Sequence, residues 1–169
     1  GNAGNITAYW KGYQEYSTDQ GALKAVVNKR PIMCGYQAAG ATPFTLGYMV
    51  DEPETVATAI RIGHPQSWDS AWAAKEQSGG WFDCFEDVKI LEAQKMLSAY
   101  EGIFCEPASA TSLAGALKDI TSGKIPEGSK IVCTLTGNGL KDPDTAIAQS
   151  TIKPTTVDAE LGAVKTAIL

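Results

Sequence analysis

Short apolar runs alternate with longer amphipathic stretches along this chain, and that alternation limits the possible fold more than any other feature. Strands are predicted at residues 31–36, 81–85, 103–105 and 131–135. Helices are predicted after Asn5, at residues 51–61 and 68–77, from Asp87 to Gly102, and from Ser109 to Gly123. Strands separated by helices at this spacing are typical of a mostly parallel twisted sheet with helices on both faces. The predicted fold class is α/β.

The first predicted helix carries an aromatic stripe. Ile6, Tyr9, Trp10, Tyr13 and Tyr16 recur at helical spacing. We interpret them as a face packed on the core rather than as a ligand site.

Composition and charge exclude several classes of protein. The 169 residues are 44% apolar, which is enough for one core. The net charge of -5 argues against a nucleic-acid partner or an anionic membrane surface, because both bind clustered Lys and Arg. No apolar run reaches the roughly 20 residues of a membrane helix, and no segment resembles a signal peptide. We therefore expect a soluble protein with no membrane or nucleic-acid partner.

The cysteines do not indicate disulfides or a metal site. Cys34, Cys84, Cys105 and Cys133 are far apart, and each lies in a short apolar segment. A buried reduced thiol behaves as a small hydrophobic group, and we interpret them in that way. With a single histidine and no clustered thiols, a zinc site is not expected.

Three polar loops, two of them containing glycine, follow predicted or inferred strands and define the candidate site. They are residues 1–5, 106–109 and 136–139. Ligands of parallel sheets bind at the carboxyl ends of the strands, so these loops are expected to converge on one edge.

Each loop allows more than one interpretation from its residues alone. Residues 1–5 could hold a phosphate on backbone amides at a helix N-terminus, or form only a tight turn. Thr136 could hydrogen-bond a cofactor ring nitrogen, or cap its own loop. Glu106 could line the pocket, cap the next helix or face solvent. His64 is interpreted as a surface residue, and Arg61 could bind a substrate anion or pair with a surface carboxylate.

Six motifs, in order along residues 1 to about 145, together resemble the threonine synthases of bacterial type. They are Gly-Asn-Ala-Gly-Asn-Ile-Thr-Ala-Tyr-Trp-Lys-Gly-Tyr at 1–13, Gly-Tyr-Gln-Ala-Ala-Gly-Ala at 35–41, Ala-Ile-Arg-Ile-Gly-His-Pro-Gln-Ser-Trp at 59–68, Glu-Gln-Ser-Gly-Gly at 76–80, Phe-Cys-Glu-Pro-Ala-Ser-Ala at 104–110, and Leu-Thr-Gly-Asn-Gly-Leu-Lys-Asp-Pro-Asp at 135–144. The family belongs to the tryptophan-synthase-β-like class of pyridoxal-phosphate enzymes, fold type II.

The resemblance implies a reaction, a cofactor and site residues. Threonine synthases convert O-phospho-L-homoserine and water to L-threonine and phosphate with pyridoxal 5'-phosphate. The cofactor phosphate is expected on the backbone amides of the opening loop, and the pyridine nitrogen at Thr136. The opening-loop residues are Gly1, Asn2, Ala3, Gly4 and Asn5. Glu106 and Gly137 are the candidates to line the pocket.

The resemblance also implies that this chain is the C-terminal half of a longer enzyme. The family's Schiff-base lysine lies in an upstream Lys-Asp motif, and Lys141-Asp142 belongs to a different segment. We therefore predict no catalytic residue and no synthase activity in this chain alone. Residues 1–145 are assigned to the cofactor-binding domain and 146–169 to a C-terminal extension. We expect this chain to pair with the missing N-terminal half of the same protein and the enzyme to be a homodimer. We also expect a cytoplasmic location, and a plastid location is left open.

Three positions depart from the family pattern. His64 and Gln66 stand where the family usually has Asn and Ala, and Gln77 is an extra residue between Glu76 and Ser78. We interpret these changes as surface drift. The alternative functions are another fold type II lyase, such as a threonine dehydratase, or a non-catalytic phosphate-binding domain.

Overall fold

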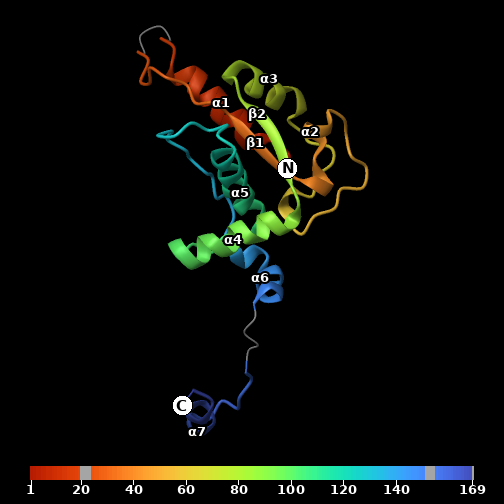
Figure 1. Cartoon of the computed structure of the whole chain (residues 1–169), viewed down its shortest axis with the longest axis vertical. Helices are drawn as coiled ribbons and strands as arrows, with labels where there is room; N and C mark the ends of the chain where they lie inside the picture. The colour runs from red at the N-terminus through yellow and green to blue at the C-terminus, as the bar shows by residue number, and fades with distance from the viewer. Residues whose placement is uncertain (20–23, 151–154, 169) are drawn as a thin grey trace.

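The computed structural model describes residues 1–19, 24–150 and 155–168. Its strands are β1 (Cys34–Ala38) and β2 (Trp81–Phe85). Its helices are α1 (Gly4–Tyr16), α2 (Pro43–Leu46), α3 (Trp68–Ser78), α4 (Asp87–Glu101), α5 (Pro107–Thr121), α6 (Pro143–Gln149) and α7 (Leu161–Ile168). Short 3-10 turns form η1 (Ala39–Ala41), η2 (Thr58–Ile60) and η3 (Gly139–Lys141). Helix α7 lies at the far end of the molecule from the sheet (Figure 1).

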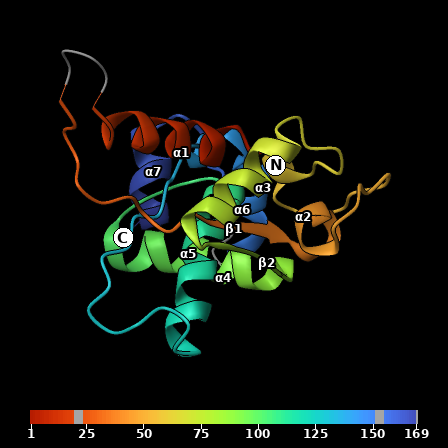
Figure 2. The ribbon, with the colours of Figure 1, turned by 90° about the horizontal axis from the view of Figure 1, so that it is seen from above.

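The two strands pair in parallel, in a register that runs from Cys34 opposite Trp81 to Ala38 opposite Phe85. Helices α4 and α5 cover one face of this sheet, and α1, α2 and α3 lie on the other (Figure 2). The predicted α/β class with helices on both faces is confirmed. The predicted β2 has the observed bounds, and β1 begins later than predicted, at Cys34.

Helix α5 rests directly on β1. A Cβ atom at Gly115 would lie 2.4 Å from the Tyr36 ring, so only glycine allows this approach. At the end of α5, the buried carboxylate of Asp119 accepts hydrogen bonds from the Tyr36 hydroxyl at 2.5 Å and from Trp81 Nε1 at 2.7 Å. Asp119 therefore joins α5 to both strands.

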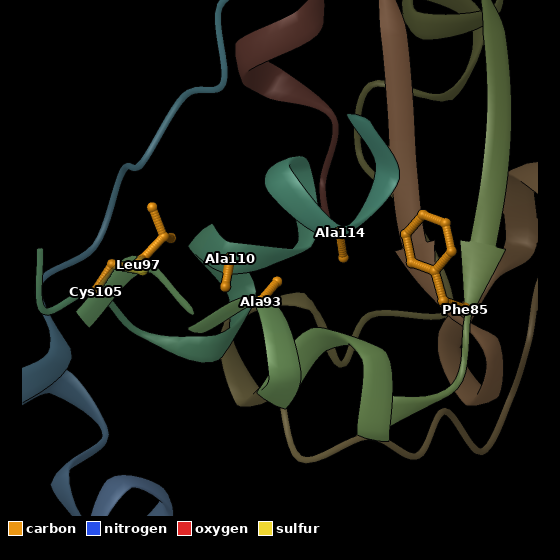
Figure 3. Packing of buried hydrophobic residues seen from close by; sticks show 6 residues of the cluster. All are labelled: Phe85, Ala93, Leu97, Cys105, Ala110 and Ala114. Carbon is orange, nitrogen blue, oxygen red and sulfur yellow. The ribbon is translucent and has the colours of Figure 1, made fainter. Parts of the chain in front are cut away.

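The main apolar cluster lies between α4, α5 and the end of β2 (Figure 3). It consists of Phe85, Ala93, Leu97, Cys105, Ala110 and Ala114. Alanines on both helices let the two backbones come close. This cluster fixes the start of α5, from which the candidate site extends.

Two predicted strands do not form. Residues 131–135 are irregular, and 103–105 make only an isolated antiparallel bridge between Cys105 and Asn138. A strand needs a neighbour for its backbone hydrogen bonds, and the described residues offer residues 131–135 none. Val132 is accordingly 89% exposed.

The helix predicted at 51–61 is also wrong, because tertiary contacts hold the backbone of this segment instead. The Val56 amide donates to the Asp87 carboxylate at 2.8 Å, and the Glu54 amide donates to the Gly40 carbonyl at 2.9 Å. Only η2 is helical in this segment. Asp87, where the predicted helix begins, is the first residue of α4, and its side chain is hydrogen-bonded to this loop.

The aromatic stripe of α1 is a core face only in part. Trp10 is 5% exposed and packs with Met33, Ala74 and Ile6. The three tyrosines on the helix are exposed: Tyr9, Tyr13 and Tyr16. The helix was predicted to begin after Asn5, and it begins earlier, at Gly4, so Asn5 lies inside the first turn of α1.

The four cysteines are free thiols. Burial raises the pKa of Cys34 to about 11 and also raises the pKa of Cys105 and Cys133, so their thiolate forms are disfavoured. Among the described residues, no helix is long and apolar enough to cross a membrane. The same residues contain no group of three His, Cys, Asp or Glu side chains placed to hold a metal.

Two glycine substitutions test the packing of α5 on the sheet. Gly115→Ala should lower the free energy of unfolding by about 1–3 kcal/mol, because the methyl group would overlap the Tyr36 ring. Gly12→Ala on α1 should instead raise it by about 0.5–1 kcal/mol, because no atom lies near its Cβ position. Urea unfolding of both variants measures whether each substitution lowers or raises the free energy of unfolding. An unchanged stability in Gly115→Ala would contradict the packing of α5 on Tyr36.

Candidate functional site

The loop at the start of α5 and the loop at residues 136–139 meet side by side. The Glu106 amide donates to the Gly137 carbonyl at 3.1 Å, and the Gly139 amide donates to the Phe104 carbonyl at 3.1 Å. These two bonds form the bridge between Cys105 and Asn138. Two of the three predicted loops therefore form one unit.

Glu106 lies inside this unit rather than in solvent. Its side chain is 6% exposed and makes no capping bond to the α5 amides. A Cβ at Gly137 would lie 1.9 Å from Glu106 Oε1, so the carboxylate packs on the bare backbone of that glycine. The capping and solvent-facing interpretations of Glu106 are therefore not observed.

Ser109 is a residue of this unit that the sequence analysis did not single out. It is 3% exposed, and its Oγ accepts a hydrogen bond from the Gly137 amide at 2.9 Å. Serine in the first turn of a helix is common, so only the fold shows that its partner lies 28 residues away.

Thr136 is exposed, and its hydroxyl makes no hydrogen bond with the described residues. The alternative in which this hydroxyl caps its own loop is therefore not observed. Asn138, two residues later, has that role, because its side chain accepts from the Leu140 amide at 2.9 Å. The Thr136 hydroxyl is left available to a ligand.

The opening loop forms a backbone concavity at the start of α1. Ala3 has a left-handed conformation with φ of 61°, and Gly4 begins the helix. A left-handed residue next to helical residues turns successive amides to one side, which is a common anion-binding arrangement. No side chain caps α1, so these amides and the positive end of the helix dipole are free to bind an anion.

Asn2 ties the opening loop to the start of α3. Its carbonyl accepts from the Ser67 amide at 3.1 Å, and its Oδ1 accepts from the Gln66 amide at 3.3 Å. Asn2 thus uses both of its oxygens inside the chain. Its observed role is to hold the loop in place.

The opening loop reaches the other two loops through η2. A Cβ at Gly1 would lie 3.2 Å from the Ala59 carbonyl oxygen, so Gly1 is in close contact with η2. Ile60 of η2 and Ala108 of α5 pack against the same small buried cluster, formed by Ala38, Ala57 and Ile90. The opening loop is therefore a neighbour of the α5 start, without direct bonds to it.

Other candidate residues have structural roles. His64 is exposed and lies 2.9 Å from the Asp51 carboxylate, as its surface interpretation predicted. Arg61 donates through Nε to the Thr55 carbonyl at 3.0 Å, which is a contact to the backbone rather than to a carboxylate. Lys141 is exposed at the end of η3.

Gln77 is more than surface drift. Its Oε1 accepts from Trp10 Nε1 at 2.8 Å and from Gln14 Nε2 at 2.8 Å. Gln77 is exposed, as its surface interpretation predicted, and its side chain also joins α3 to α1.

The fold places helices on both faces of a parallel sheet, with a left-handed turn at the start of α1 and a polar loop unit at the start of α5. The family model described as "Pyridoxal-phosphate dependent enzyme" matches residues 1–137. The chain belongs to this family.

Nearly the whole chain is similar in sequence to threonine synthases. That of Mycobacterium leprae is 54% identical over 160 residues, covering 94% of this chain and 43% of the relative. That of Bacillus sp. is 48% identical over 165 residues, covering 98% and 45%. That of Methanocaldococcus jannaschii is 42% identical and covers 98% and 41%. The chain thus spans less than half the length of these curated relatives.

Two solved structures show the same fold. Maize serine racemase aligns with a TM-score of 0.53 at 20% identity, over 68% of this chain and 38% of its own. A threonine deaminase from T.th. aligns with a TM-score of 0.51 at 17% identity, over 72% and 39%. At these identities the likeness concerns the fold alone, which is that of the fold type II enzymes.

The left-handed alanine of the opening loop provides a test of its conformation. Ala3→Gly should raise the free energy of unfolding by about 1 kcal/mol, because glycine adopts positive φ without a Cβ penalty. Thermal unfolding without added anions measures the effect. A lower stability in the variant would show that residue 3 is not left-handed in solution.

Proposed function

We propose that this chain is the C-terminal portion of a threonine synthase, the enzyme that converts O-phospho-L-homoserine and water to L-threonine and phosphate. One observation carries the proposal: threonine synthases match nearly the whole chain at 42% to 54% identity. The geometry adds support, because η2 contacts the opening loop and packs on the same buried cluster as the start of α5, which is hydrogen-bonded to the Thr136 loop. The cytoplasmic location stays a prediction.

The opening loop fits the phosphate of pyridoxal 5'-phosphate. Amides at Ala3, Gly4 and Asn5 are the donors that the turn presents to an anion. A Cβ at Gly4 would meet no atom of this chain within 4 Å, so packing inside the chain does not require glycine there. A ligand held close to the backbone explains the glycine. Gly1 and Asn2 serve this site by anchoring the turn.

Thr136 fits the ring end of the same cofactor. Its exposed, unbonded hydroxyl can donate to or accept from a pyridine nitrogen. When bound, the cofactor acts as an electron sink for carbanionic chemistry at the amino-acid substrate. A neutral hydroxyl partner, rather than a carboxylate, leaves the ring nitrogen largely unprotonated. Glu106 and Gly137, which pack on each other next to Thr136, are the residues we propose to line the same pocket.

Exposed apolar side chains support the proposal that a further part of the protein packs against this chain. Ile131 and Val132 are exposed and have no strand beside them among the residues that the structure describes, and the α1 tyrosines are exposed. In the curated relatives more than half of the length lies outside the matched part. We propose that this remainder supplies a strand beside residues 131–135 and the lysine that binds the cofactor. The chain alone is then inactive, and a homodimer of the complete enzyme remains part of the proposal.

A lyase of related chemistry is the alternative function. The solved threonine deaminase shares the fold at 17% identity, which carries no argument about its reaction. The threonine synthases share 42% or more with this chain. The comparison therefore favours the synthase over the dehydratase.

Joining the chain to its complement tests the proposal. The experiment fuses the part of the Mycobacterium leprae threonine synthase that precedes the match to residue 1, which gives a protein we call the completed enzyme. Phosphate release from O-phospho-L-homoserine should require the completed enzyme and pyridoxal phosphate, and the 169-residue chain alone should show none. A completed enzyme that folds, binds the cofactor and deaminates threonine instead would support the alternative.

Removal of the Thr136 hydroxyl should weaken catalysis in the completed enzyme. Thr136→Val keeps the shape and should lower kcat by roughly ten- to a hundredfold, the cost of one lost hydrogen bond of about 1–3 kcal/mol. The exposed Thr121→Val on α5 is the control, because its hydroxyl donates only to the Leu117 carbonyl. Steady-state kinetics measure both variants, and equal rates would remove Thr136 from the site.

A further inference from the structure

Ser109 is a buried hydroxyl that the proposed chemistry does not use. Its Oγ accepts from the Gly137 amide at 2.9 Å, and this is the only hydrogen bond that the Gly137 amide makes within the described residues. The Ser109 hydroxyl proton has two acceptors within reach, Glu106 Oε1 at 3.4 Å and the Gly137 carbonyl at 3.5 Å. Both lie in the loop unit.

Gly137 is held at both ends of its backbone. Its amide donates to Ser109, and its carbonyl accepts from the Glu106 amide at 3.1 Å. The Glu106 carboxylate packs where a side chain would stand. Since the peptide bond that joins Thr136 to Gly137 is planar, fixing the Gly137 amide fixes the Thr136 carbonyl as well. The same plane holds the Cα–C bond of Thr136, and the Thr136 side chain extends from that Cα atom.

We propose that Ser109 is a positioning residue: its hydroxyl fixes the 136–137 peptide and so aims the Thr136 hydroxyl at the cofactor ring nitrogen. The inference rests on the proposed function for the identity of the ligand. It assigns to Ser109 no contact with substrate or cofactor. Its effect reaches the site through a single backbone bond.

A nearby residue separates this role from packing. Thr111 lies on the same helix, is 2% exposed, and donates its hydroxyl only to the Pro107 carbonyl at 3.3 Å, one turn back. Thr111→Val removes an equally buried hydroxyl from α5 with no bond to the 136–139 loop. It is the matched control for Ser109→Ala.

The first measurement is amide hydrogen exchange in the 169-residue chain, which requires no cofactor. Ser109→Ala should speed exchange at Gly137 by about fivefold or more, because the amide loses its acceptor. Exchange within β1 and α4 should not change, and Thr111→Val should leave Gly137 as in the unmodified chain. Unchanged Gly137 exchange in Ser109→Ala would overturn the inference.

The second measurement is the ¹⁵N chemical shift of the ring nitrogen in labelled pyridoxal phosphate bound to the completed enzyme. Thr136→Val gives the limiting shift, at which the nitrogen has no hydroxyl partner. Ser109→Ala should move the resonance at least halfway toward that limit and lower kcat more than it changes KM. Thr111→Val should move neither.

The outcomes separate the two proposals. If Thr136→Val leaves the ring-nitrogen shift unchanged, the proposed role of Thr136 fails, whatever Ser109 does. If Thr136→Val moves the shift and Ser109→Ala does not, the site stands and the positioning role of Ser109 is wrong. If Ser109→Ala and Thr111→Val act equally, the effect is one of packing, and the inference is overturned.

Discussion

The contact of α5 with the sheet is the constraint on which the candidate site depends. Gly115 lets the helix rest on the Tyr36 ring, and the buried Asp119 carboxylate binds both strands through Tyr36 and Trp81. Burial, followed by the hydrogen bond to Asp119, raises the pKa of Tyr36 and keeps its hydroxyl a donor. A buried charge with two hydrogen-bond donors is costly to displace. The helix axis is thereby fixed at its C-terminal end.

A fixed helix axis also determines what its other end can hold. Glu106 and Ser109, at the start of α5, contact the 136–139 loop. The main apolar cluster between α4 and α5 holds the start of this helix in place (Figure 3). Residues 130–136 reach this loop as irregular chain, so the Thr136 backbone depends on α5 rather than on a sheet. For this reason the buried Ser109 can influence the Thr136 site without contacting the ligand.

Sequence signals predicted helix ends correctly where residues next to the helix end decide them. Helices α3 and α4 stop at Gly79 and Gly102, both left-handed, because glycine ends a helix there at no Cβ penalty. The predictions failed where distant partners decide the backbone. In residues 51–61, hydrogen bonds to Gly40 and Asp87 hold the backbone in a non-helical conformation. Residues 131–135 have no neighbouring strand among the described residues. Apolar periodicity reports that a face can be buried, and it does not report whether a partner is present to bury it.

By itself, the sequence determined the α/β class, because the spacing of apolar and amphipathic segments is local. The six motifs pointed to the family through their resemblance to threonine synthases, and residue type and position marked the three loops as the candidate site. The tertiary structure alone decided that two of those loops form one hydrogen-bonded unit, that Asn2 anchors the opening loop to the start of α3, and that Gln77 joins two helices. The pairing of Ser109 with Gly137 belongs to the same group. These facts join residues 28 to 67 positions apart, and only packing brings such residues within bonding distance.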